Sequence, residues 1–321
     1  MKKIVLFLML LFPFNVWALE MPDIHSQYAI VYDLTSNEEI IEKNSLEVIS
    51  IASLTKIMTV LTALENCDDL DKDVVITSSM LRGIYWNASV AGLKAGDVVT
   101  FRDLLYATIL PSGADAAQAL AYATTGDVAT FVGKMNELAI SLGLSNTHFM
   151  NTIGLDNKEH YSTAKDVLII LMQALKNETF REVYTTREYT LKNGLVVNST
   201  LDLYNKYMNL DLSRILGSKT GNTSNAGLCM SSLIKKDNHE LLLITLKGDR
   251  INNDYYNVLD TLTLIDYLDL NYEIPVEVSK MEEQTLAEED KTTINFNFRK
   301  EYIYVILVVL VFIILNKKSI Y

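Results

Sequence analysis

The chain has 321 residues and a formal net charge of −12 at neutral pH, with 28 basic side chains against 40 acidic ones. It carries no basic stripe, so we expect no nucleic-acid partner. Cys67 and Cys229 are too few to form a disulfide framework in a chain of this length; we expect two isolated buried thiols, with a single pairing as the alternative.

The first eighteen residues have the pattern of a secretory signal. Lys2 and Lys3 precede an unbroken apolar run over residues 4–12, and small side chains flank Trp17 at the expected cleavage positions. An apolar run of this length is too short to span a bilayer, which argues against an N-terminal membrane anchor. Residues 1–18 are therefore predicted to be a signal peptide.

Residues 19–270 are predicted to form one catalytic domain of the α+β class. A strand over 28–32 is followed by a turn-like cluster, and the chain from 53 to about 176 is mostly helical in pattern. Thr100 and Asp103 resemble a capping box. Strands return at 189–191, 218–220, 228–234 and 241–246, before a closing helix over 254–268; the earlier helices are expected at 54–64, 114–124, 128–142 and 164–176. This order predicts an antiparallel sheet flanked by helices, with an inserted helical lobe and a substrate groove between the two.

The C-terminal end is predicted to be an acidic linker followed by a membrane anchor. Residues 271–300 include a stretch with six acids, two lysines and no aromatic residue over 277–291. As a helix, residues 301–316 would be about 24 Å long, which is short of the roughly 30 Å hydrocarbon core, but basic residues that can snorkel flank the segment. We expect export of the domain to the outer face of the bacterial cytoplasmic membrane, with Lys317 and Lys318 inside.

Ser53 and Lys56 are the first candidate catalytic pair. Their spacing places a hydroxyl and an amine about one helical turn apart, at a helix start where the dipole is positive. The simpler alternatives are a helix N-cap for Ser53 and a solvated surface charge for Lys56. A second Ser-x-x-Lys, Ser232 to Lys235, falls in a strand-like run where the two side chains would not share a face.

Two further elements strengthen the assignment. Lys219, Thr220 and Gly221 offer a cation, a hydroxyl and an open backbone along one predicted strand; Lys219 could help to keep Lys56 neutral, and Gly221 would let a substrate backbone approach. Ser112, in a tight turn before a helix, could pass a proton between the lysine and a leaving group, or could simply cap the helix. Together these are the parts of a serine acyltransferase that uses lysine as its base.

With these elements in this order, the chain resembles the serine-type D-alanyl-D-alanine carboxypeptidases, the low-molecular-mass penicillin-binding proteins. The likeness extends over about residues 25–268. It implies the β-lactamase/transpeptidase-like fold. The likeness stops before residue 273, so we expect the additional β-rich domain that many relatives carry there to be absent. The segments that carry it are 52–59, 134–136, 142–144, 146–149, 154–156, 160–164 and 217–223.

The resemblance implies a role for each site residue. Ser53 would be the acylated nucleophile, Lys56 its base and Ser112 a proton carrier, and the N–H groups of Ser53 and Asn222 would form the oxyanion hole. Lys219, Thr220, Gly221 and Arg250 would bind a peptidoglycan pentapeptide ending in D-Ala-D-Ala, with β-lactam antibiotics as covalent inhibitors and no cofactor. A surface ion pair accounts for Arg250 equally well. The sequence departs from the family at Ala114, where relatives have an asparagine whose amide bonds substrate and lysine.

Three readings remain open at this point. The first is a membrane-tethered carboxypeptidase, the second a catalytically weak wall-binding or regulatory protein suggested by Ala114, and the third a β-lactamase, for which we find no convincing activating glutamate.

His148 and His160 lie close in sequence, but no His-Glu-x-x-His motif or acidic ligand set accompanies them. We therefore expect packing and hydrogen bonding, and no metal, at these histidines.

Overall fold

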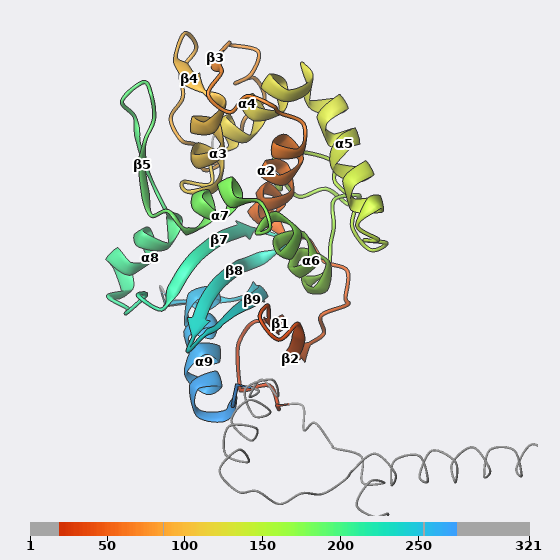
Figure 1. Ribbon diagram of the computed structural model, residues 1–321, viewed down its shortest axis with the longest axis vertical. Coiled ribbons are helices and arrows are strands. Elements are labelled where there is room, and N and C mark those ends of the chain that lie inside the picture. Colours follow the sequence, from red (N-terminus) through yellow and green to blue (C-terminus); the bar gives the residue numbers. More distant parts are fainter. Residues whose placement is uncertain (1–18, 86, 253, 275–321) are drawn as a thin grey trace, which may run out of the picture. The chain divides into compact units, whose positions relative to one another are not determined.

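The computed structural model describes residues 19–85, 87–252 and 254–274. Its main sheet joins the two ends of the domain (Figure 1). Strands β1 (Tyr28–Asp33) and β2 (Glu38–Lys43) pair with three later strands in the order β2-β1-β9-β8-β7, and every pair is antiparallel. The later strands are β7 (Ile215–Thr223), β8 (Gly227–Lys236) and β9 (His239–Gly248), so that β7 forms one edge of the sheet.

Alternation along the strands divides the core between the two faces of the sheet. Ile30 and its partner Ile244 point to one face, whereas Val31 and its partner Leu243 point to the other. Helix α9 (Tyr256–Asn271) packs on β8 and β9 and covers the second face (Figure 1). The first face carries the helical lobe through α6 (Ala164–Ala174) and α7 (Glu178–Thr185).

Helix α2 (Thr55–Glu65) lies at the centre of the helical lobe. Ten of its eleven residues are buried, because α3, α4, α5, α6 and α7 all pack against it. The remaining helices of the lobe are α3 (Phe101–Ile109), α4 (Ala114–Thr125), α5 (Val128–Ser141) and α8 (Thr200–Met208). Five helices of the lobe begin at side-chain caps, which satisfy N–H groups that a helix start leaves unpaired. The caps are Thr100 for α3, Asp127 for α5, Thr163 for α6, Asn177 for α7 and Ser199 for α8.

The predicted α+β class, the antiparallel sheet and the inserted helical lobe are confirmed, as is the capping box at Thr100 and Asp103. Sequence reasoning did not assign β2, α7 or α8. The strand expected at 189–191 is present as β5 (Glu188–Thr190), but it pairs with β6 (Val196–Asn198) in a separate two-stranded ribbon, and β6 was not predicted. Sequence reasoning also missed two further ribbons, formed by β3 (Asp73–Val75) with β4 (Val98–Thr100) and by β10 (Arg250–Ile251) with β11 (Asp254–Tyr255).

Cys67 and Cys229 are both free; Cys229 is buried and Cys67 half-buried, so burial was predicted correctly only for Cys229. Within residues 19–274, where two single positions are not described, no helix is both long and apolar enough to cross a membrane. The predicted signal peptide, anchor and most of the acidic linker lie outside the described residues.

Candidate active site

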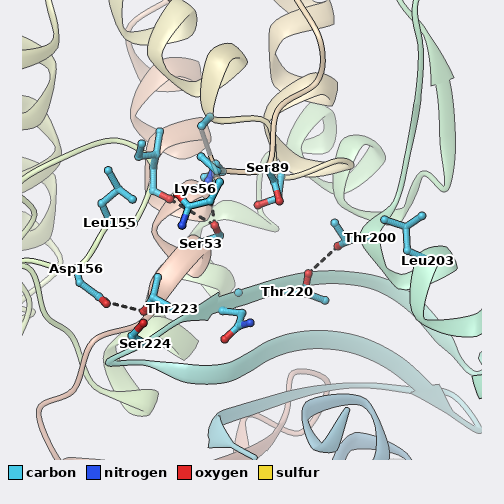
Figure 2. Close-up of a pocket in the computed structure, with 18 of the residues that line it drawn as sticks. Ser53, Lys56, Ser89, Leu155, Asp156, Thr200, Leu203, Thr220, Thr223 and Ser224 are labelled. Atoms are coloured by element: carbon cyan, nitrogen blue, oxygen red, sulfur yellow. Dashed lines mark hydrogen bonds between the residues drawn. The ribbon is translucent and has the colours of Figure 1, made fainter. Parts of the chain in front are cut away.

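Ser53 and Lys56 face each other at the start of α2. Ser53 lies in the 3₁₀ turn η2 (Ala52–Leu54), which leads into the helix. The Lys56 Nζ is 3.0 Å from the Ser53 Oγ and donates to the Ile153 carbonyl oxygen at 2.8 Å (Figure 2). Ser53 is therefore no helix cap, and Lys56, which is 2% exposed, is no surface charge.

The burial of Lys56 changes its acid–base chemistry. Removal from water lowers the pKa of Lys56 to about 7, and the negative charge of Asp115 offsets part of this effect. Burial also lowers the pKa of Lys219, and the charge of Lys56 lowers it further. Because two buried ammonium groups repel each other, the pair favours states in which one amine is neutral. Near neutral pH, the Lys56 amine can therefore accept a proton from Ser53.

Ser112 enters the site from a strained turn. It has a φ of 60°, is 4% exposed and precedes α4, whose N-cap is Gly113. A Cβ at Gly113 would lie 2.5 Å from the Ala107 carbonyl oxygen, so only glycine fits this turn. Ser112 makes no capping hydrogen bond to α4, which removes the simple capping explanation within the described residues.

Ala114, the departure from the family pattern, is buried at the first position of α4. Its N–H donates to the carbonyl oxygen of Ser89 at 2.8 Å. The next residue, Asp115, accepts backbone N–H groups from residues 91, 92 and 93 of the same loop. These bonds hold the loop against α4, and its Asn87 and Ser89 line the same cavity as Ala114.

Strand β7 supplies the opposite wall. Gly221 lies so close to the nucleophile that a Cβ there would be 2.9 Å from the Ser53 backbone nitrogen. The sequence predicted that Gly221 admits a substrate backbone; the structure adds that it admits Ser53 itself. Thr220 contacts Thr200 of α8, with 2.7 Å between the two hydroxyl oxygens (Figure 2). Asn222 follows on the same strand and lines the cavity.

A cavity of about 690 Å³ joins these elements. It is lined by six of the eight predicted site residues, namely Ser53, Lys56, Ser112, Thr220, Gly221 and Asn222. Lys219 is absent from the lining, because it is fully buried and donates to the Thr220 carbonyl oxygen at 2.6 Å. Arg250 is exposed on β10, with its guanidinium 4.7 Å from the ring centre of Tyr255, which does line the cavity.

Several lining residues escaped sequence reasoning. Asn87 and Ser89 lie in a loop without periodicity. The one available signal was Asp115, an acidic residue in the first turn of α4, whose carboxylate binds the backbone of that loop. Helix α8 contributes Thr200 and the apolar side chains of Leu203 and Tyr207, and its sequence pattern is too short to be distinctive. Each of these residues is brought to the site by tertiary packing.

Asp156 also lines the cavity, on the segment that carries Ile153. Its carboxylate accepts from the Thr223 hydroxyl at 2.6 Å and from the Asn225 N–H at 3.1 Å, so both of its oxygens bind the β7–β8 turn (Figure 2). Asp156 therefore fastens this segment to the sheet and is not placed as the free activating carboxylate that a β-lactamase requires.

The two histidines take part in packing and hydrogen bonding. His160 is buried between Thr55 and Met150, and His148 pairs with the backbone of Glu159 and lies near Tyr161. No group of three or more His, Cys, Asp or Glu side chains that could hold a metal occurs among the residues described. The second Ser-x-x-Lys lies on β8, with Ser232 buried and Lys235 exposed, as its strand pattern predicted.

Comparison with known proteins assigns this arrangement to a family. Residues 15–250, well over half of the chain, match the D-alanyl-D-alanine carboxypeptidase family. A D-alanyl-D-alanine carboxypeptidase of Streptomyces sp. strain K15 is 40% identical over 56% of this chain, and DacF of Bacillus subtilis is 35% identical over 67%. The matches span 66% and 56% of those two proteins, so the chain covers less than two thirds of either relative.

Solved structures agree with the fold. The Streptomyces K15 DD-transpeptidase has a TM-score of 0.68 at 32% identity, and the match covers 77% of this chain and 97% of that one. A D-alanyl-D-alanine carboxypeptidase from Mycobacterium tuberculosis has a TM-score of 0.69 at 28% identity, with 81% and 97% covered. The β-lactamase/transpeptidase-like fold expected from the sequence is therefore confirmed.

Proposed function

Because the chain belongs to the D-alanyl-D-alanine carboxypeptidase family, we propose that it is a serine-type carboxypeptidase that removes the terminal D-alanine from peptidoglycan stem peptides. The observation that carries this proposal is the Ser53–Lys56 pair, 3.0 Å apart in the wall of the cavity. A lysine with a pKa of about 7 is neutral often enough at physiological pH to act as a general base.

In the proposed reaction, the Ser53 Oγ attacks the carbonyl carbon of the penultimate D-alanine while Lys56 accepts the hydroxyl proton. The N–H groups of Ser53 and Asn222 stabilise the resulting oxyanion. The C–N bond to the terminal D-alanine then breaks, and Ser112 passes the proton from Lys56 to the leaving amine. Water hydrolyses the Ser53 ester, which restores the serine hydroxyl and releases the shortened peptide.

The substrate is a pentapeptide ending in D-Ala-D-Ala. Its terminal carboxylate would bind at the Thr220 hydroxyl, with Lys219 buried beside Thr220 and with Arg250 near the end of the cavity. β-Lactam antibiotics would acylate the same serine and act as covalent inhibitors. The reaction uses neither a metal nor a cofactor.

Benzylpenicillin provides the direct test. The intact mass of the protein should rise by one drug molecule, and Ser53→Ala should remove the adduct. An adduct that persists in Ser53→Ala would refute the assignment of the nucleophile. Release of D-alanine from a pentapeptide, measured beside penicillin hydrolysis, separates the carboxypeptidase from the wall-binding and β-lactamase alternatives, since the first releases D-alanine and only the last turns penicillin over rapidly.

We also propose that the catalytic unit is exported and tethered to the outer face of the cytoplasmic membrane. The support is the sequence pattern of residues 1–18 and 301–316. A chain that ends before Glu301 should appear as a soluble and active protein outside the cytoplasm. If that product stays bound to membranes after a high-salt wash, the single-anchor proposal is wrong.

A further inference from the structure

The peptide unit between Ala52 and Ser53 is held in a conformation that alanine rarely adopts. Ala52 has a φ of 47°, in the left-handed region. A Cβ built on Gly154 would lie 1.9 Å from the Ala52 carbonyl oxygen, and one on Gly221 would lie 2.9 Å from the Ser53 nitrogen. The backbones at Gly154 and Gly221, from two distant segments, therefore pack closely against this single peptide unit. Strained conformations of this kind persist only where the surroundings fix them.

The Thr55 hydroxyl fixes the carbonyl end of this peptide unit. Thr55 is fully buried, and its Oγ1 donates to the Ala52 carbonyl oxygen at 2.8 Å. In a trans peptide the N–H points opposite to the C=O, so a hydrogen bond that orients the carbonyl also orients the N–H of Ser53. Within the described residues, that N–H donates to no protein group, which leaves it available to an oxyanion.

His160 determines which way the Thr55 hydroxyl points. The Met150 N–H donates to its Nδ1 at 3.1 Å, so Nδ1 carries no proton. The neutral ring must then carry its proton on Nε2, which lies 2.8 Å from the Thr55 Oγ1 and donates to it. Burial lowers the pKa of His160 to about 4, which keeps the ring neutral near pH 7. With its oxygen accepting from His160, Thr55 uses its own proton for Ala52.

We infer that Thr55 and His160 are positioning residues for the oxyanion hole, acting through the Ala52 carbonyl to hold the Ser53 N–H toward the developing negative charge. The chain of hydrogen bonds runs from the Met150 N–H through His160 and Thr55 to the Ala52 carbonyl oxygen, so that His160 and Thr55 each accept one hydrogen bond and donate the next. This inference rests on the proposed function, because an oxyanion forms at this position only if Ser53 is acylated. Neither residue lines the cavity, so neither touches the substrate.

Thr55→Val and Thr55→Ser test the inference as a pair. Valine keeps the volume and removes the hydroxyl, whereas serine keeps the hydroxyl. We expect Thr55→Val to slow acylation by a fluorescent penicillin about tenfold or more, less than the hundredfold or greater loss that follows removal of an oxyanion donor. Thr55→Ser should recover most of the rate. Thr261→Val is the matched control, because Thr261 is also buried and donates to a carbonyl of its own helix, α9, on the far face of the sheet.

A peptide boronic acid distinguishes positioning from general stability. Its tetrahedral adduct with Ser53 places an oxygen in the oxyanion hole, so its affinity should fall in Thr55→Val by about the same factor as acylation. The KM for the pentapeptide should change little, and the thermal midpoint should fall no more than in Thr261→Val. His160→Met should resemble Thr55→Val, and His160→Gln, which keeps an N–H near the Nε2 position, should be closer to wild type.

Three results would overturn the inference. They are wild-type acylation and boronate affinity in a folded Thr55→Val protein, a Thr55→Ser protein as slow as Thr55→Val, or a slower acylation with unchanged boronate affinity. Failure of the proposed function looks different, because wild-type protein would then form no adduct with penicillin at all.

Discussion

In the reaction proposed above, acylation of Ser53 should become about tenfold faster between pH 6 and pH 8, because a lysine amine accepts a proton only when it is neutral. Burial lowers the pKa of Lys56 to about 7. The neutral fraction is then about one tenth at pH 6 and about nine tenths at pH 8. A lysine at its ordinary pKa of 10.5 would be neutral in only about one molecule in three thousand at pH 7.

The perturbation that probes the cause of this pKa is Asp115→Asn. The Asp115 carboxylate raises the pKa of Lys56, so its removal should move the midpoint of the acylation profile to lower pH. The same carboxylate anchors the loop over residues 91–93, and a thermal unfolding measurement on the variant is therefore needed beside the kinetics.

The assay is the second-order rate constant for a fluorescent penicillin, measured by rapid mixing from pH 5.5 to 9.5. A profile that is flat from pH 6 to 8, or whose midpoint lies above pH 9, would refute the argument that a desolvated Lys56 is the base. A midpoint that rises in Asp115→Asn would refute the assigned sign of the Asp115 effect.

Lys56→Met should stabilise the fold by a few kcal/mol below pH 7, because the wild-type protein must bury a charged amine there. Calorimetry should show this advantage shrinking as pH rises from 7 toward 10.5, since the unfolded wild-type chain then binds more protons than the folded one and wild type gains stability. An advantage that is constant with pH would contradict the lowered pKa of Lys56. Thr200→Val removes the hydrogen-bond partner of the Thr220 hydroxyl. It should raise the KM for a D-Ala-D-Ala peptide several-fold at a thermal midpoint close to that of wild type. An unchanged KM would count against a role of Thr200 in positioning Thr220. Ala114→Asn should speed peptide acylation by up to about tenfold if the amide reaches the cavity, whereas slower acylation in a folded variant would show a site rebuilt around alanine. Asn87 lines the cavity with Ala114, and its amide could take the role of the asparagine that relatives have at position 114. Asn87→Ala should then slow peptide acylation more in wild type than in Ala114→Asn, and equal effects in a double-mutant cycle would exclude this exchange of roles.

Most of the architecture could be predicted because local patterns and tertiary structure agree. The strands expected at 218–220, 228–234 and 241–246, and the capping box at Thr100, depend on near neighbours in the sequence. Helix α8 was missed for the opposite reason: Leu201 is fully buried against the core near α9, but Leu203 and Tyr207 are exposed, so its nine residues show no clear apolar face.

The site divides in the same way. Ser53, Lys56 and Ser112 could be identified from spacing and motif, and their alternatives as caps or surface charges could be rejected only once burial was known. The lowered pKa of Lys56 depends on five helices that pack around α2, and no local pattern encodes it. Gly221 shows the limit most clearly, since its contact with the Ser53 nitrogen joins residues 168 positions apart.

The pairing of β1 with β9 has a consequence for how the protein matures. Tyr28 is opposite Leu246, so the central part of the sheet cannot close until more than two hundred residues of chain are present. Contacts this distant in sequence slow folding, because a long loop must be ordered before they form. A chain that is still being synthesised would hold Ser53 early and lack β7 until late. Covalent labelling by penicillin therefore reports completed folding, and a stalled or truncated chain would be insensitive to the drug.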